Sequence, residues 1–230
     1  MARIKRKELK RNELAETFGR TVDYVSHHRR GAVEAIGATA AVLVLAAGFI
    51  LFRGWREHQA GKELSAALEI LEAPVATDPG AAAAFRKFST AADREREATK
   101  HLREAAAKGG TDAGRAARVI LAARSDKPAQ AVEILSKEAR EARAEVAAAA
   151  EIGAARLLAS EGKMTEAIDR LKGAIDSSRS LVPKDALLFA LAETYEKAGS
   201  STDARATYQR LVNDYPNSPY RNDAREKIQG

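Results

Sequence analysis

The chain of 230 residues contains no cysteine. This absence excludes disulfide bonds, thiol nucleophiles and thiolate metal sites, but it leaves the redox compartment open. Aromatic residues make up only 5% of the chain and there are six prolines, whereas alanine supplies much of the 45% hydrophobic content. Because alanine is the best helix former and β-branched residues favour strands, this composition predicts an all-α fold.

A concentrated basic face is also missing from most of the chain. Residues 1–30 hold nine Lys or Arg against four acidic residues, whereas residues 53–230 are nearly balanced, with 29 basic and 27 acidic residues. A nucleic-acid-binding domain needs clustered positive charge. We therefore expect no nucleic-acid partner for the C-terminal region.

One long apolar run is present. Residues 35–52 read AIGATAAVLVLAAGFILF and contain no charge. As a helix this run would be about 27 Å long, close to the hydrocarbon thickness of a bilayer. A buried helix of a soluble protein is the first alternative, but no other segment is apolar enough to surround it. A cleaved signal peptide is the second, but the preceding basic region is long and no cleavage motif follows. We predict a transmembrane helix from Ala35 to Phe52 that contacts the lipid bilayer.

The flanks of this run predict its orientation. Basic residues are more numerous before the run than after it, and Trp55 stands where an interfacial aromatic would lie. The positive-inside rule then places residues 1–34 in the cytoplasm and the C-terminal domain in the periplasm of a bacterium. Residues 13–26 have helix-turn-helix spacing, but 30 residues leave little room for the third helix that such a domain needs. We favour an amphipathic helix on the inner leaflet, with its apolar face formed by Leu14, Phe18, Val22 and Val25.

The C-terminal region contains internal repeats. Residues 191–216 match the tetratricopeptide pattern of two helices with small residues at their closest approach and a glycine between them. The matching residues are Leu191, Ala192, Tyr195, Gly199, Ala204, Tyr208 and Pro216. A weaker copy lies 37 residues upstream, where Gly162 and Ala167 correspond to Gly199 and Ala204.

A third copy contains Ala131 and Leu135, but Arg115 and Arg118 stand near positions expected to be apolar, so its register is open. A helical bundle without repeats is the alternative, although its helices would lack the shared small residues and glycine turns. We predict a tetratricopeptide-like α-solenoid over residues 111–230, closed by a polar C-terminal helix. Residues 53–110 are predicted to form a helical spacer and the first helices of the soluble domain, with residues 81–108 as one helix.

Residues with catalytic or metal-binding potential are few. The four histidines, His27, His28, His58 and His101, are scattered, and none has a second ligand at i+4 on a helix face. No glycine-rich phosphate loop is present. We predict no enzymatic activity, no metal, no cofactor and no small-molecule substrate.

Stacked helical hairpins leave a concave groove lined by the first helix of each hairpin. Projecting the repeat positions onto that surface gives six candidate partner-binding residues, although each alone could be an ordinary solvated residue. They are Ile152, Arg156, Phe189, Glu193, Glu196 and Lys197.

The order of these segments resembles the YfgM-like family of ancillary Sec-translocon subunits. The resemblance rests on the basic arm, the apolar run followed by Trp55, His58 and Ala60, the alanine-rich spacer and the degenerate repeats. The ending DYPNSPYRNDAREKI is also similar to repeats of periplasmic envelope proteins of the CpoB and BamD types. The first resemblance implies association with the Sec translocon and periplasmic chaperones. An envelope-assembly or cell-division scaffold is one alternative, and a membrane-tethered DNA-binding regulator is another.

Overall fold

The computed structural model describes residues 29–78, 87–177 and 183–229, and of residues 29–40 it describes the backbone alone. Contacts divide the chain into two units, Met1–Gly54 and Trp55–Gly230. The described ranges are mainly helical and contain no strand, apart from an isolated bridge between Val75 and Phe88. This confirms the predicted all-α fold. The amphipathic helix predicted over residues 13–26 lies outside the described residues.

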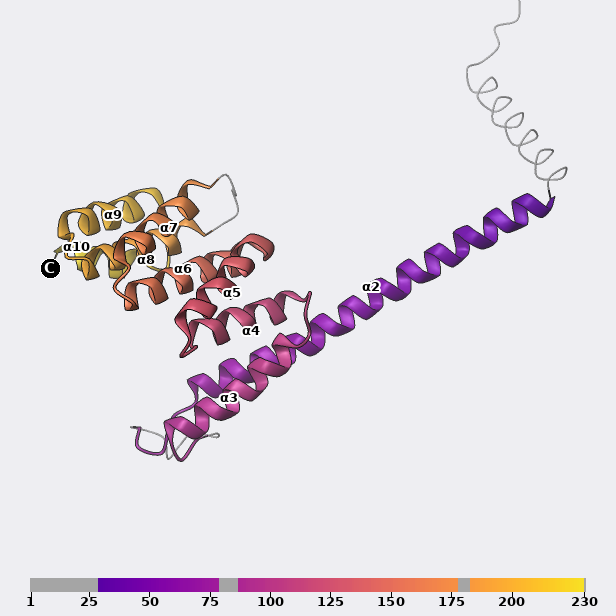
Figure 1. Cartoon of the computed structure of the whole chain (residues 1–230), viewed down its shortest axis with the longest axis horizontal. Coiled ribbons are helices and arrows are strands. Elements are labelled where there is room, and N and C mark those ends of the chain that lie inside the picture. Colours follow the sequence, from indigo (N-terminus) through magenta and orange to yellow (C-terminus); the bar gives the residue numbers. More distant parts are fainter. Residues whose placement is uncertain (1–28, 79–86, 178–182, 230) are drawn as a thin grey trace, which may run out of the picture. The chain divides into compact units, whose positions relative to one another are not determined.

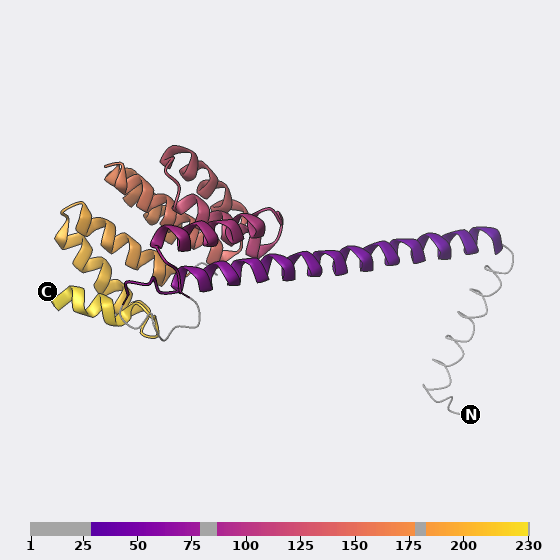
Figure 2. The same cartoon turned by 90° about the horizontal axis from the view of Figure 1, so that it is seen from below.

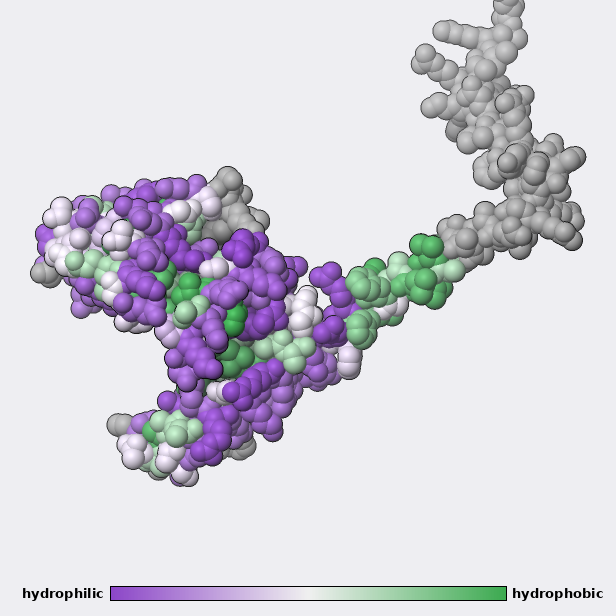
Figure 3. Space-filling view, in the orientation of Figure 1, coloured by the Kyte–Doolittle hydropathy of each residue, from purple (hydrophilic) through white to green (hydrophobic). Residues whose placement is uncertain are grey.

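Helix α2 (Arg29–Glu72) contains the apolar run (Figures 1 and 3). Its large apolar side chains from Val42 to Phe52 are between 53% and 75% exposed. Within the described part of the chain, no helix meets the length and hydropathy that a membrane span requires. The span predicted from Ala35 to Phe52 begins on residues 35–40, whose side chains lie outside the described set.

The C-terminal part of α2 belongs to the core of the second unit. Ala60, Ala67 and Ile70 of this helix have no exposed surface. Ala67 and the partly buried Leu64 pack with residues of α3 (Ala91–Ala106) and α4 (Asp112–Ala123). Helix α2 ends before Pro74, as the proline and the following turn residues predict.

Helix α3 is shorter than predicted. The single helix predicted over residues 81–108 is wrong for residues 87–90, and residues 81–86 lie outside the described chain. The Phe88 amide donates to the carbonyl of Pro74 at 3.1 Å, and the Ala76 amide donates to the carbonyl of Phe88 at 2.8 Å. Thr90 then caps the helix, because its hydroxyl oxygen accepts from the Asp93 amide at 3.1 Å. The pairing with residues 74–76 therefore overrides the helix propensity of this segment.

The N-terminus of α4 is capped from a distance. The amides of Asp112 and Ala113 donate to the two carboxylate oxygens of Glu57 at 2.9 and 3.0 Å. The Gly114 amide donates to the Thr111 hydroxyl at 3.0 Å. A carboxylate is favourable at this end of a helix because the free amides carry partial positive charge. Glu57 therefore joins α2 to the first repeat.

Three helical hairpins follow, and their first helices lie next to one another (Figures 1 and 2). Helix α4 contacts α6, and α6 contacts α8, whereas each second helix packs against both the first helix of its own hairpin and the next helix along the chain. This arrangement is the solenoid order that the repeats predict. The remaining elements are α5 (Pro128–Glu141), α6 (Ala144–Ser160), α7 (Met164–Asp176), α8 (Lys184–Lys197), α9 (Ser201–Asp214) and the closing helix α10 (Arg221–Gln229).

The second and third hairpins use the same turn. Gly162 and Gly199 have φ values of 79° and 76°, a left-handed conformation that favours glycine. The residue after each glycine donates its amide back to the preceding helix: Lys163 to the Leu158 carbonyl, and Ser200 to the Tyr195 carbonyl, each at 2.9 Å. These are the bonds of a Schellman motif. The glycine turns predicted from the 37-residue spacing are confirmed.

The first hairpin has a charged contact between its helices. Glu138 of α5 is only 3% exposed and accepts from two arginines of α4. Arg118 Nε donates to Glu138 Oε1 at 2.7 Å, and Arg115 Nη1 donates to Glu138 Oε2 at 3.1 Å. The arginines at positions expected to be apolar therefore pair with a buried carboxylate. Ala131 and Leu135 of α5 are buried in the register that the third copy predicts.

Candidate functional site

A concave groove runs across the first helices of the three hairpins. Its cavity measures about 630 Å³ and is lined by residues of α4, α6 and α8, together with Tyr220 from the turn before α10. Its large apolar lining residues are Val119, Ile120, Ile152, Leu157, Phe189 and Tyr220. Apolar clefts with a few charges at their edges are typical sites for side chains of a bound partner.

Aromatic rings form one end of the groove. The Phe189 ring stacks on Tyr220 with 5.1 Å between centroids, and its edge meets Tyr208 at 5.6 Å. Tyr208 is buried, and its hydroxyl contacts a carboxylate oxygen of Glu196 at 3.3 Å. Burial, and then the negative charge of Glu196, raise the pKa of Tyr208. The phenol is therefore neutral at physiological pH, and the ring contacts fix the position of Phe189.

The charged groups at the edge of the groove are arginines paired with acids. Arg156 of α6 donates to Glu193 of α8 at 3.2 Å, which links two adjacent hairpins. Arg124, the C-cap residue of α4, donates through Nε to Glu95 of α3 at 2.8 Å. The hydrogen bond from Arg124 is the main cause of a lowered pKa at Glu95. Because both pairs are partly exposed, each should contribute little to stability.

The structure distributes the six candidate residues over two places. Ile152, Arg156 and Phe189 line the groove, and Glu193 reaches its edge through the ion pair with Arg156. The other two, Glu196 and Lys197, are exposed near the C-terminal end of α8.

Glu196 faces away from this groove. Its carboxylate contacts the Tyr208 hydroxyl and, at 3.0 Å, the ammonium group of Lys227 on α10. These contacts place Glu196 in a second cavity, formed mainly by α9. Glu196 therefore joins α8 to α9 and α10.

Most residues of the groove lining were absent from the sequence-based selection, among them Val119, Ile120 and Tyr220. Val119 and Ile120 belong to α4, whose register the two arginines left open. Tyr220 lies in a turn, where helical projection gives no direction. The aromatic character of Tyr220, beside a helix predicted to close the stack, was the available signal.

Comparison with known families supports the assignment of the last hairpin. The family described as Tetratricopeptide repeat matches residues 185–218, which include nearly all of α8 and the whole of α9. The last hairpin is therefore similar to a tetratricopeptide repeat. No curated protein and no solved structure matches the chain. The fold and this match support a tetratricopeptide-like protein, and such repeats typically form non-enzymatic protein-binding scaffolds.

Proposed function

We propose that the protein is an interaction scaffold whose groove receives an apolar segment of a protein partner. The observation that carries this proposal is the continuous apolar lining contributed by three successive hairpins, with Arg124 and Arg156 at its edges. A partner segment with large apolar residues flanked by acids would match this surface. We expect no catalytic role, which stays a prediction.

We further propose that the apolar run of α2 and the residues before it anchor the protein in a bacterial inner membrane. The exposed side chains from Val42 to Phe52 support this, because a surface of this size needs a partner or a lipid phase. The excess of basic residues before the run supports a cytoplasmic arm and periplasmic repeats.

The resemblance to the YfgM-like family supports a narrower proposal about the partners. A scaffold held at the periplasmic surface beside the Sec translocon would meet emerging polypeptides and the periplasmic chaperones that receive them. No relative tests this resemblance, so the translocon and the chaperones are named here as proposed partners.

Site-specific photo-crosslinking tests the groove. A photoreactive residue at Ile152 should capture a defined partner in cells, because this position lines the cavity. The control is the same residue at Asp169, which is exposed on α7 and lies outside the groove lining. Equal capture from both positions would contradict the groove proposal. Identification of the captured protein then decides between the translocon, a chaperone and another envelope protein.

The absence of cysteine provides a direct test of the membrane proposal. A single cysteine placed at Lys172 of α7 should react with a membrane-impermeant maleimide in intact spheroplasts, whereas one placed at Lys7 should react only after lysis. Extraction of the protein by carbonate at high pH, without detergent, would contradict the anchor. The reverse labelling pattern would contradict the orientation alone.

A further inference from the structure

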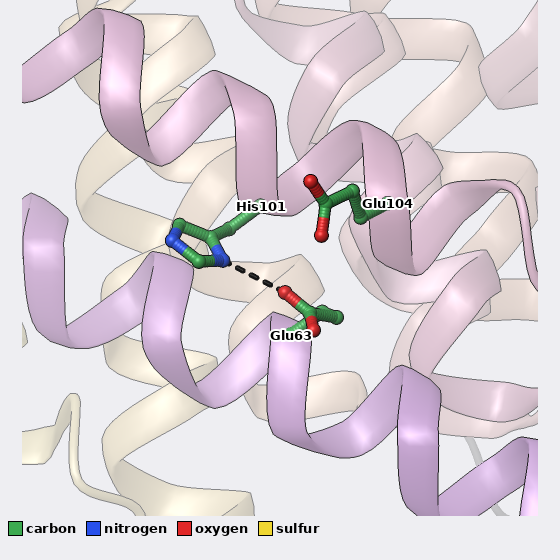
Figure 4. A group of neighbouring side chains, drawn as sticks. All are labelled: Glu63, His101 and Glu104. Atoms are coloured by element: carbon green, nitrogen blue, oxygen red, sulfur yellow. Dashed lines mark hydrogen bonds and ion pairs between the residues drawn. The ribbon is translucent and has the colours of Figure 1, made fainter.

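A histidine and two carboxylates converge between α2 and α3. Figure 4 shows Glu63 from α2 and His101 and Glu104 from α3 with their polar groups turned toward one another. His101 Nδ1 lies 2.7 Å from Glu63 Oε2, and the potential ligand atoms of all three residues lie within 4.8 Å of one another. These ligands come from two helices and include no i, i+4 pair, so helical spacing in the sequence does not reveal the group.

The backbone places these side chains together. His101 and Glu104 are three residues apart and share one face of α3. Leu102 follows His101 and Ala105 follows Glu104 in the chain. Both are buried and belong to the cluster that also contains Ala67 of α2. The packing of the two helices therefore fixes the separation of the three side chains. The side chains of Glu63 and His101 are only 27% and 25% exposed.

We propose that Glu63, His101 and Glu104 form a binding site for a divalent transition metal ion, with Zn²⁺ as the representative cation. One imidazole nitrogen and carboxylate oxygens are ligands that Zn²⁺ accepts, and three protein ligands leave one position for water. A positive ion would also compensate the two neighbouring carboxylates.

The ligand atoms must rearrange when the ion binds. Tetrahedral ligands about 2.0–2.1 Å from Zn²⁺ are separated by roughly 3.3 Å, which is less than the present 4.8 Å limit. Glu104 is exposed and can move inward by a change of rotamer, whereas His101 Nδ1 and Glu63 Oε2 lie 2.7 Å apart and must separate by about 0.6 Å. Lys108, whose charge acts on Glu63, opposes the ion and must turn toward solvent.

The test uses the full chain in a background in which His101 is the only imidazole. The chain has four histidines, so the triple variant H27A/H28A/H58A removes every competing one. Competition with a chromogenic chelator should show saturable binding of one Zn²⁺ per chain. Co²⁺ bound at the same site should give visible absorption bands as strong as those of Co²⁺ complexes that have few ligands. The absence of saturable Zn²⁺ binding in this background would overturn the proposal.

Ligand variants then locate the ion. His101→Ala and Glu63→Gln should each weaken Zn²⁺ binding at least tenfold, since even outer partners of metal ligands contribute about 10–100-fold. Glu69→Gln, an exposed residue of the same helix outside the group, is the matched control and should leave binding unchanged. Circular dichroism would detect a variant at His101 that fails to fold. In that case Glu104→Gln, a change at the protein surface, takes its place. Equal affinity in His101→Ala and the control would overturn the site.

Discussion

The first and last hairpins share a geometry but are stabilised by different interactions. Helices α8 and α9 meet through Tyr208, Leu211 and other buried apolar side chains of one continuous core. Helices α4 and α5 also have an apolar cluster, but Glu138 joins them through two arginines. Small residues such as Ala131 and Ala204 occupy the same close approach in both. The comparison indicates that the small residues define the hairpin, whereas the larger positions accept either apolar or paired charged side chains.

The largest expected effect is on the last hairpin. Tyr208→Ala removes a ring that is 1% exposed and contacts Phe189, so the free energy of unfolding should fall by about 3–5 kcal/mol. Hydrogen exchange measured by mass spectrometry should accelerate in α8, α9 and α10. Exchange in α4 and α5 should change little, because stability in stacked repeats depends on nearest neighbours. Uniform acceleration along the domain would show that the two hairpins unfold together.

The first hairpin should be sensitive to loss of its buried charge. Glu138→Leu leaves Arg115 and Arg118 without this carboxylate, and both arginines are partly buried. Because they can still reach water, we expect a loss of about 2–3 kcal/mol, below the range for a fully buried pair. Urea denaturation measures the loss, and hydrogen exchange should assign it to α4 and α5.

The control for this change is Glu141→Leu. Glu141 contacts the same Arg115, but its side chain is 47% exposed. Its loss should cost less than about 1 kcal/mol. An equal loss of stability in Glu138→Leu and Glu141→Leu would show that the burial of Glu138 does not determine how much it stabilises the fold.

The glycine turn should contribute less to the free energy of unfolding than Tyr208 of the last hairpin or Glu138 of the first. Gly199→Ala forces a left-handed φ on alanine, so the last hairpin should lose about 1–2 kcal/mol in thermal or urea unfolding. Gly173→Ala is the control, because this glycine lies within α7 and an added Cβ meets nothing within 4 Å. That change should stabilise by roughly 0.5–1 kcal/mol. Destabilisation by both changes would contradict the conformational explanation.

The last effect is confined to alkaline pH and is absent at neutral pH. The raised pKa of folded Tyr208 means that the unfolded chain ionises first as pH rises, so the contribution of this residue is complete below about pH 10 and is lost above it. Compared with Tyr208→Phe, the natural chain should lose up to about 1.4 kcal/mol of stability per pH unit above that point. Urea denaturation from pH 8 to 11.5 measures the difference, with Tyr215→Phe as the control. A difference that is constant with pH would exclude ionisation of Tyr208 as its cause.

The sequence was most informative where the structure depends on neighbours along the chain. Small residues and glycines at a constant spacing predicted the second and third hairpins, because each helix pairs with the next. They did not predict the partner of Arg115 and Arg118, since Glu138 lies 20 or more residues away and no periodic rule connects them. The predicted start of α3 was wrong because it also depends on a distant contact, the pairing of residue 88 with residues 74–76.

In the candidate site, too, the sequence predicted what depends on the repeat register and not what depends on distant contacts. Helical projection selected Ile152 and Phe189, which share one cavity, because both follow from the repeat register. It could not indicate that Glu196 joins α8 to α9 and α10, since that depends on where Tyr208 and Lys227 lie in space. The convergence of Glu63 with His101 likewise depends on the packing of two helices that are 38 residues apart at this contact.

The cap that Glu57 provides has a consequence for the order of folding. Its carboxylate closes the start of α4 across 55 residues, whereas each later hairpin closes across a short turn. The entropic cost of closing a loop rises with its length, and local contacts form faster than distant ones. We expect the two C-terminal hairpins to form early and the first hairpin to complete its folding only when α4 reaches α2. During synthesis, the buried face of α2 would then stay open until more than fifty further residues have emerged.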